Sequence, residues 1–172
     1  MRALAISGSL RAASINSAFC RVLVQLAPTG HVAEFSPAPG ELPLFNPDLD
    51  STPPVSVVRF RHAVAEADAL VIASPEYAHG VTGVIKNTLD WLVSFEGAVG
   101  KPVALVNTSP RARHAQESLA EILVTMSMRV VPAASISLPL LGYLRTEGEM
   151  RVSTEVRQAI RRIFEALAAD SA

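Results

Sequence analysis

The sequence is poor in cysteine and in charge, and each shortage argues against a class of protein. One cysteine in 172 residues leaves no internal disulfide, so we expect a reducing, cytoplasmic location. Charged residues make up 18% and the net charge is −1, which argues against nucleic acid and anionic membranes as partners. No apolar run is long enough to span a bilayer. Polar residues 7–9 come too soon for the core of a signal peptide, so we expect none.

Two common nucleotide-binding fingerprints are also missing. The chain has no G-x-G-x-x-G after its first apolar run and no G-x-x-x-x-G-K-[ST] anywhere. A dinucleotide pyrophosphate bound in Rossmann style and a Walker-type triphosphate are therefore disfavoured. The histidines His31, His62 and His114 are scattered, and no metal-ligand spacing is present, so we expect no metal site.

Apolar residues, by contrast, are abundant. They make up 49% of the chain, and its length suits a single domain over residues 1–172 with a full core. This apolar content exceeds that of an average soluble domain. We therefore expect part of the surface to be buried in a homo-oligomer. Cys20 lies in an expected helix, where it should act as a small buried hydrophobe.

Expected strands and helices alternate along the chain. The strands are expected at 2–6, 31–35, 69–73, 102–106 and 129–138, the last interrupted by a proline. The helices are expected at 14–27, 55–67, 81–95, 115–128 and 153–168. This order predicts an α/β fold with a five-stranded parallel sheet between helices. Ligands bind such sheets beyond the carboxyl ends of the strands, so the turns after strands one, three and four should converge.

Two connections are expected to be long. Residues 36–54 are rich in proline and should form a packed or functional loop, with Leu42, Leu44 and Phe45 as its apolar contacts. Residues 139–150 are expected to form a second loop before the last helix.

The first turn, residues 7–17, has the composition of a phosphate site. A strand, a polar turn and a helix N-terminus aim free N–H groups and the positive end of the helix dipole at one spot. Serine hydroxyls, the Asn16 amide and the Arg11 guanidinium gather there, and arginine can grip two phosphate oxygens at once. The alternative is a serine-rich turn with Ser14 as a helix cap. If a phosphate binds, a terminal monoester such as that of FMN is favoured, and the flavodoxin-like fold is its usual host.

The second turn, residues 74–80, follows the central strand. Tyr77 is placed to lie against a flat aromatic ligand, or alternatively to pack into the core. We expect His79 and Gly80 to begin the third helix, with N–H groups facing the pyrimidine edge of a flavin. Alternatively, His79 is solvated at the tip of a loop.

Two motifs in these turns resemble those of the NAD(P)H-dependent FMN reductase family, which includes chromate, quinone and azo-dye reductases. Residues 8–16 contain G-S-L-R-x-x-S-x-N, which looks like the phosphate loop of that family. Residues 74–77 read S-P-E-Y and residues 83–92 read G-V-I-K-N-T-L-D-W-L, which look like its second signature. The order of elements matches as well, so the resemblance covers nearly the whole chain.

The resemblance implies a flavodoxin-like three-layer sandwich with strand order 2-1-3-4-5, noncovalent FMN and a homodimer or homotetramer. It implies NAD(P)H as the electron donor. Residues matching the phosphate loop are Ser9, Arg11, Ser14, Asn16 and Ser17. Residues expected to border the isoalloxazine and ribityl chain are Pro75, Glu76, Tyr77, Ala78, His79 and Gly80.

The chain departs from this family in two places. Many members have Asn where this chain has Ala78, which removes a side-chain amide near the ligand. Many have a glycine-rich turn after the fourth strand, where this chain has the bulky, basic segment Thr108–His114. Ser109 could still contact the flavin. The two arginines of this turn either meet the phosphate of a nicotinamide cofactor or are simply solvated.

The expected function is an FMN-dependent oxidoreductase that uses NAD(P)H to reduce free flavin, quinones or related small acceptors. Donor and acceptor would alternate at the flavin in ping-pong turnover, and no protein acid or base is required, so no catalytic residue is named. Two alternatives remain open. One is a flavodoxin-type electron carrier, although such carriers are usually strongly acidic. The other is a flavin-free regulator of the same fold that binds another phosphate ligand.

Overall fold

The centre of the molecule is a parallel β-sheet. The computed structural model describes residues 1–109, 111–140, 144 and 146–170. The strands lie in the order β2 (Val32–Phe35), β1 (Arg2–Ser7), β3 (Ala69–Ala73), β6 (Pro102–Asn107) and β7 (Arg129–Val130). A further strand, β8 (Ile136–Ser137), pairs in parallel with the carboxyl end of β6. The expected fifth strand is therefore split in two around Pro132, and the predicted order 2-1-3-4-5 is confirmed.

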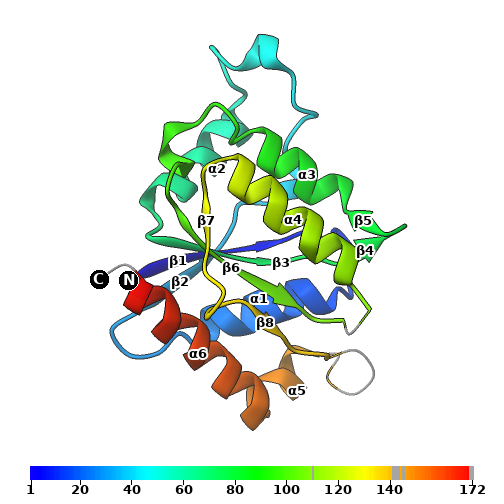
Figure 1. The fold of residues 1–172 in the computed structure, drawn as a ribbon, viewed down its shortest axis with the longest axis vertical. Helices are drawn as coiled ribbons and strands as arrows, with labels where there is room; N and C mark the ends of the chain where they lie inside the picture. The colour runs from blue at the N-terminus through cyan, green and yellow to red at the C-terminus, as the bar shows by residue number, and fades with distance from the viewer. Residues whose placement is uncertain (110, 141–143, 145, 171–172) are drawn as a thin grey trace.

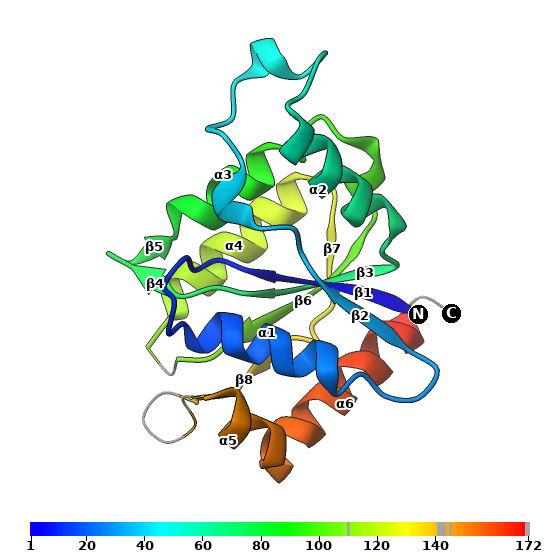
Figure 2. The same ribbon diagram turned by 180° about the vertical axis from the view of Figure 1, so that it is seen from behind.

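Helices cover both faces of the sheet and complete the predicted three layers (Figure 1). One layer contains α1 (Ile15–Gln25), α5 (Glu147–Val152) and α6 (Thr154–Asp170). The other contains α2 (Val55–Glu66), α3 (Gly83–Asp90) and α4 (Arg113–Thr125). The view from behind shows that the end of α6 lies beside the N-terminus (Figure 2). No helix within the described residues is both long and apolar enough to cross a bilayer.

The alternation of side chains along β1 builds two separate cores. Ala3 and Ala5 face the cluster formed with α1 and α6, whereas Leu4 and Ile6 face the cluster formed with α2, α3 and α4. Cys20 is fully buried in the first cluster, and this burial raises the pKa of its thiol to about 12. It is therefore a small core side chain, as predicted.

Two segments differ from the sequence-based prediction. The third helix begins at Gly83, because residues before it form a hairpin of β4 (Glu76–Tyr77) and β5 (Gly80–Val81). Part of the expected loop 139–150 is helical, and α5 begins with a capping box between Thr146 and Glu149. Residues 141–143 and 145 of that loop lie outside the described residues.

The long connection 36–54 is packed against α3, as expected of a structured loop. It contains the short 3-10 helices η1 (Pro39–Glu41) and η2 (Pro47–Leu49), and a third, η3 (Glu96–Ala98), follows α3. The Trp91 indole donates to the Pro43 carbonyl at 2.8 Å, and the Phe45 amide donates to Asn87 Oδ1 at 2.8 Å. Leu42 is buried, but Leu44 is 84% exposed, so its predicted apolar contact was wrong.

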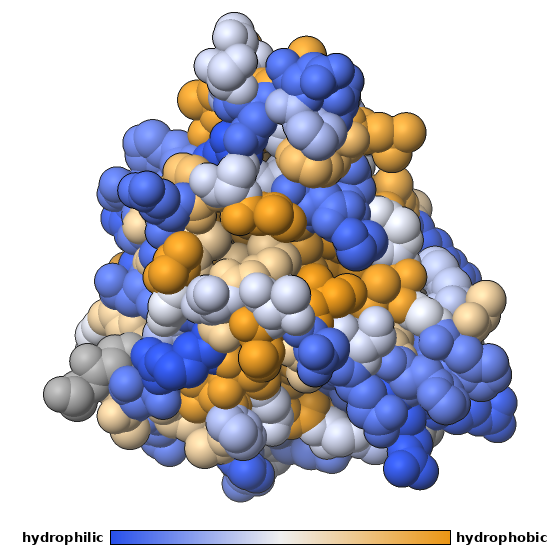
Figure 3. Space-filling model, turned by 45° about the horizontal axis from the view of Figure 1, so that its top comes forward, coloured by the Kyte–Doolittle hydropathy of each residue, from blue (hydrophilic) through white to orange (hydrophobic). Residues whose placement is uncertain are grey.

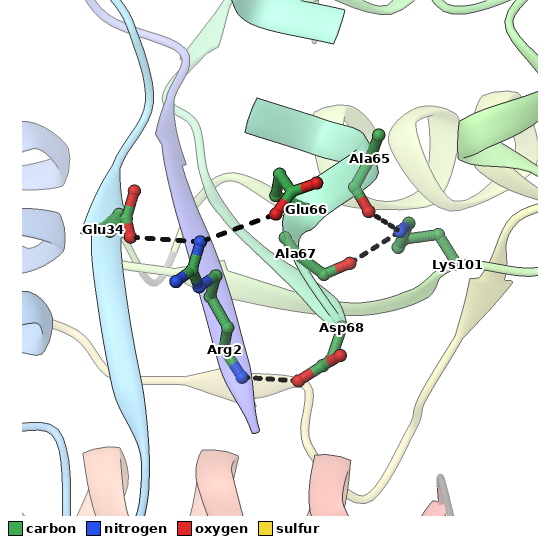
Figure 4. Close-up of polar contacts among 7 residues, drawn as sticks. All are labelled: Arg2, Glu34, Ala65, Glu66, Ala67, Asp68 and Lys101. Carbon is green, nitrogen blue, oxygen red and sulfur yellow. Dashed lines mark hydrogen bonds and ion pairs between the residues drawn. The ribbon is translucent and has the colours of Figure 1, made fainter. Parts of the chain in front are cut away.

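Charged groups at the amino end of the sheet are paired (Figure 4). The Arg2 guanidinium lies 3.7 Å from Glu34 and 4.0 Å from Glu66, and the Arg2 amide donates to Asp68. The Lys101 ammonium donates to the Ala67 carbonyl at 2.6 Å, just beyond the C-terminus of α2. Such a cation complements the negative end of the helix dipole.

Candidate functional site

A cleft of about 270 Å³ opens at the carboxyl ends of β1, β3 and β6. All three turns that the sequence singled out line it, so their predicted convergence is confirmed. The lining residues are Ser9, Arg11, Ala13, Ser14, Ile15, Asn16, Pro75, Glu76, Tyr77, Thr108, Ser109, Arg111 and Ala112.

The first turn presents the N-terminus of α1 to this cleft. The Ser14 amide donates to the Arg11 carbonyl at 3.0 Å, which closes the turn, and Ser14 Oγ caps the helix by accepting from the Ser17 amide at 3.2 Å. The N–H groups at the start of a helix have no acceptor within it. Since Ser14, Ile15 and Asn16 line the cleft, this helix start can serve an anion there.

Buried hydrogen bonds hold the backbone of this turn in place. Ser17 Oγ is 2.8 Å from Ser7 Oγ and donates to the Ser9 carbonyl at 3.3 Å, so Ser17 braces the loop and does not line the cleft. Asn16 lines the cleft, and its Oδ1 accepts from Thr108 Oγ1 at 2.9 Å. The Asn16 contact joins the first turn to the third.

Gly8 joins the first turn to the second through a close approach of the two backbones. A Cβ at this position would lie 2.6 Å from Ser74 Cβ and 3.2 Å from Ser74 Cα, which leaves room only for glycine. The Gly8 carbonyl accepts from Thr82 Oγ1 at 2.7 Å, and the same oxygen of Thr82 caps α3. One buried hydroxyl therefore holds both the loop and the helix.

The second turn is a hairpin, and the expectation that His79 and Gly80 begin a helix was wrong. Ala78 and His79 both have positive φ angles, 49° and 59°, as in the tight turns that connect antiparallel strands. Neither residue lines the cleft, and neither does Gly80. Tyr77 does line the cleft and is 58% exposed, so it does not pack into the core.

Glu76 connects this hairpin to the third turn. The residue at the N-cap of α4 is Ala112, which has no side chain to cap the helix. The Glu76 carboxylate takes this role by accepting from the Ala115 amide at 2.9 Å, and it also lies 3.3 Å from His79 Nδ1. The His79 side chain is mostly exposed, and its ring meets the His114 ring edge to face, with the two ring centroids 4.6 Å apart.

The third turn is shaped by the side chain of Asn107. Its Oδ1 accepts from the Ser109 amide at 3.0 Å and its Nδ2 donates to the Ala112 carbonyl at 3.1 Å. Ser109 lines the cleft as predicted from the sequence, and Arg111 lines it too. Pro110 lies outside the described residues.

Sequence reasoning did not single out Ala13, Ile15, Thr108 or Ala112 as lining residues. The alanines and the isoleucine carry no chemical signal, since only the path of the backbone brings them to the cleft. Thr108 had a usable signal, because it is a hydroxyl residue directly after a buried strand.

The cleft has an excess of positive charge. Arg11 and Arg111 line it, and neither forms an ion pair with any residue that the structure describes. Among the lining residues, all of which are described, Glu76 is the only acid, and its carboxylate is already bonded to α4 and His79. The arrangement therefore suits a ligand with at least one anionic group.

Three comparisons with known proteins agree with this arrangement. The sequence model of the NADPH-dependent FMN reductase family matches residues 1–140. An NAD(P)H-dependent FMN reductase of Pseudomonas aeruginosa is 39% identical over 112 residues, which cover 63% of this chain but only 60% of that protein. A quinone reductase of Escherichia coli K12 is 31% identical over 139 residues, covering 76% of this chain and 73% of that one.

The solved structures show the same fold. FerB, a flavoenzyme NAD(P)H:(acceptor) oxidoreductase of Paracoccus denitrificans, superposes with a TM-score of 0.81 at 24% identity, covering 98% of this chain and 97% of that one. The family match spans most of the chain and includes all three turns of the cleft. The chain therefore belongs to the NADPH-dependent FMN reductase family.

Proposed function

We propose that this protein binds FMN noncovalently in the cleft and uses NAD(P)H to reduce free flavin, quinones or related small acceptors. The observation that carries the proposal is the closure of three turns, from β1, β3 and β6, around one positively charged cleft. Membership of the family supports the same activity.

The residues present fit a mononucleotide with a phosphate tail. Ser9, Arg11, Ser14 and Asn16 would hold the phosphate at the N-terminus of α1, where hydroxyl, amide and guanidinium donors meet the helix dipole. Ser17 would act indirectly by bracing the Ser9 carbonyl. The planar, accessible ring of Tyr77 offers a surface for an aromatic ligand.

The remaining predicted residues would border the flavin ring and ribityl chain. Pro75, Glu76 and Ser109 line the cleft beside Tyr77. Ala78, His79 and Gly80 belong to the hairpin next to it and would set the position of Tyr77.

Bound FMN would supply two-electron hydride chemistry. The chain would contribute position and electrostatics: the helix start and Arg11 hold the anionic tail, and the three turns hold the ring in one orientation. No side chain is assigned as a general acid or base. Because one cleft serves both donor and acceptor, we expect ping-pong kinetics.

Substitution of Arg11 tests the phosphate assignment. Arg11→Ala should weaken FMN binding by about 1.5–3 kcal/mol, the scale of hydrogen bonds to charged groups. Riboflavin lacks the phosphate, so its affinity should stay the same. Isothermal titration with both ligands measures the difference, and Arg59→Ala, at an exposed position of α2, is the control. Equal FMN affinity in Arg11→Ala and the unaltered protein would refute the assignment.

Two measurements separate the proposed enzyme from its alternatives. A yellow protein with flavin absorbance excludes the flavin-free regulator. Consumption of NAD(P)H on addition of a quinone excludes a pure electron carrier.

We also propose that the protein forms a homodimer or homotetramer in the cytoplasm. Apolar surface gathers on the side formed by α2, α3 and α4 (Figure 3). Three valines are each at least 60% exposed, namely Val93, Val99 and Val124. Valine side chains are more often buried in a monomeric protein. Light scattering coupled to size-exclusion chromatography would give the molar mass, and a monomer at micromolar concentration would contradict the proposal.

A further inference from the structure

Arg111 is a cleft residue whose charge has no ion-pair partner among the residues that the structure describes. Other arginines, such as Arg21 and Arg61, contact carboxylates at 2.5 Å and 2.6 Å. Within the described residues, Arg111 makes no such contact, although it lines the cleft and is exposed. An unpaired guanidinium on the wall of a cleft is free to bind an anion from solution.

The backbone that carries Arg111 is held in place. Its amide donates to Ser109 Oγ at 3.4 Å, and Asn107 brackets the turn through bonds to residues 109 and 112. Hydrogen bonds at residues 109, 111 and 112 therefore restrict the backbone around Arg111, which lowers the entropic cost of using it in binding.

The phosphate contacts proposed for the flavin do not include this charge. The flavin phosphate would be served by Arg11 and the N-terminus of α1, on the first turn, whereas Arg111 belongs to the third turn after β6. The oxidised isoalloxazine ring is uncharged. A second anionic group would therefore come from the substrate that shares the cleft.

We propose that Arg111 binds the 2′-phosphate of NADPH and so makes this protein prefer NADPH to NADH. This inference rests on the proposed function. A phosphate monoester carries close to two negative charges at neutral pH and matches the fork of donors on a guanidinium. NADH lacks this group and shares every other anionic group with NADPH, so Arg111 would discriminate between the two donors.

The test uses the flavin-loaded protein with Arg111→Ala, and with Arg113→Ala as the matched control. Arg113 is exposed and lies two residues away, but it does not line the cleft. Arg111→Ala should lower kcat/KM for NADPH about tenfold, the low end for a hydrogen bond to a charged group. The value for NADH should change less than about twofold, since that donor lacks the discriminating group. Arg113→Ala should leave both values unchanged.

A titration gives a second readout that does not depend on turnover. Adenosine 2′,5′-bisphosphate should bind the unaltered protein more tightly than 5′-AMP, and Arg111→Ala should remove most of that difference. High salt should also reduce it, because the contact is exposed. An equal fall in kcat/KM for both donors, or no fall for NADPH, would overturn the proposal.

Failure of this inference can be told apart from failure of the proposed function. Arg111→Ala should remain yellow, and its FMN affinity should fall much less than that of Arg11→Ala, because the proposed phosphate contacts lie on the first turn. A protein that binds no FMN would refute the proposed function. In that case the titration with the bisphosphate would still report on Arg111.

Discussion

The two ends of the sheet differ in how their charged side chains are paired. At the amino end, Arg2 lies between Glu34 and Glu66, and Lys101 caps the last carbonyls of α2 (Figure 4). At the carboxyl end, Arg11 and Arg111 line a cleft without any ion pair to a described residue. The contrast indicates that the charges at the amino end stabilise the fold, whereas those at the carboxyl end are available to bind a ligand.

The polar groups that do pair at the carboxyl end are the ones that hold its turns together. Thr82 binds the Gly8 carbonyl, Asn16 accepts from Thr108, and Glu76 caps α4. These contacts are mostly uncharged and buried, and they set the shape of the cleft while leaving its guanidinium groups available. Substitutions at the two ends should therefore have different consequences.

The largest effect is expected from Gly8→Ala, which should destroy the geometry of the carboxyl end. The added Cβ would overlap Ser74 Cβ at 2.6 Å, so the two turns must move apart, at a cost of about 1–3 kcal/mol. Urea unfolding measures the loss, and FMN affinity should fall with it. Gly83→Ala is the control, because nothing lies within 4 Å of its Cβ position. Equal stability of the two variants would contradict the close approach.

Loss of the Glu76 carboxylate should loosen the second turn from the third. Glu76→Ala removes the acceptor of the Ala115 amide and should cost about 1 kcal/mol, the usual worth of a helix cap. Glu76→Gln keeps an acceptor oxygen and should recover most of this loss. Thermal unfolding of both variants distinguishes capping from a purely electrostatic role, for which Gln would be as damaging as Ala.

Relief of strain in the hairpin should stabilise the carboxyl end. Ala78 has a φ of 49°, which is unfavourable for alanine and better tolerated by asparagine. Ala78→Asn should raise the free energy of unfolding by about 0.5–1 kcal/mol. Ala133→Asn, an exposed loop position without positive φ, should give no gain in the same urea titration.

Lys101→Met tests the amino end and should cost about 0.5 kcal/mol at pH 7, because the hydrogen bond from the Lys101 side chain to the Ala67 carbonyl is lost. Burial lowers the pKa of Lys101 below its usual 10.5, and the nearby Asp68 carboxylate opposes this shift. The folded state therefore releases the proton before the unfolded state does. The stability of the unaltered protein relative to the variant should rise as pH increases through the folded pKa towards 10.5. A difference that shrinks over this alkaline range would contradict the lowered pKa of Lys101 in the folded protein.

The smallest changes in the free energy of unfolding are expected for Arg2→Ala and Arg11→Ala. Arg2 is in ion pairs that are about half exposed, so its removal should cost about 0.2–0.5 kcal/mol, less at high salt. Arg11 has no such pair within the part of the chain that the structure describes, so its removal should leave the free energy of unfolding unchanged without FMN. Urea unfolding at low and high salt measures both. A larger loss at Arg11 would reverse the proposed contrast between the ends.

The sequence by itself determines most of the elements, their order and the three turns that meet. Apolar runs such as residues 69–73 indicate buried parallel strands, and Ser14 signals the start of α1, because these signals act within a few residues of each other. Parallel strands then place their carboxyl ends at one edge, so the cleft follows from the order alone.

Only the tertiary structure decides which polar residues face the cleft and which hold it together. Glu76 caps α4 through Ala115, which lies 39 residues further along the chain, and Asn16 is hydrogen-bonded to Thr108, 92 residues away. Ser17 was expected to contact the ligand, but its hydroxyl donates to the Ser9 carbonyl of the loop instead. No local pattern encodes such pairs, since each depends on two turns packing at one particular distance. The hairpin at 76–81 likewise replaced the expected helix start because α4 packs against it and Glu76 is bonded there.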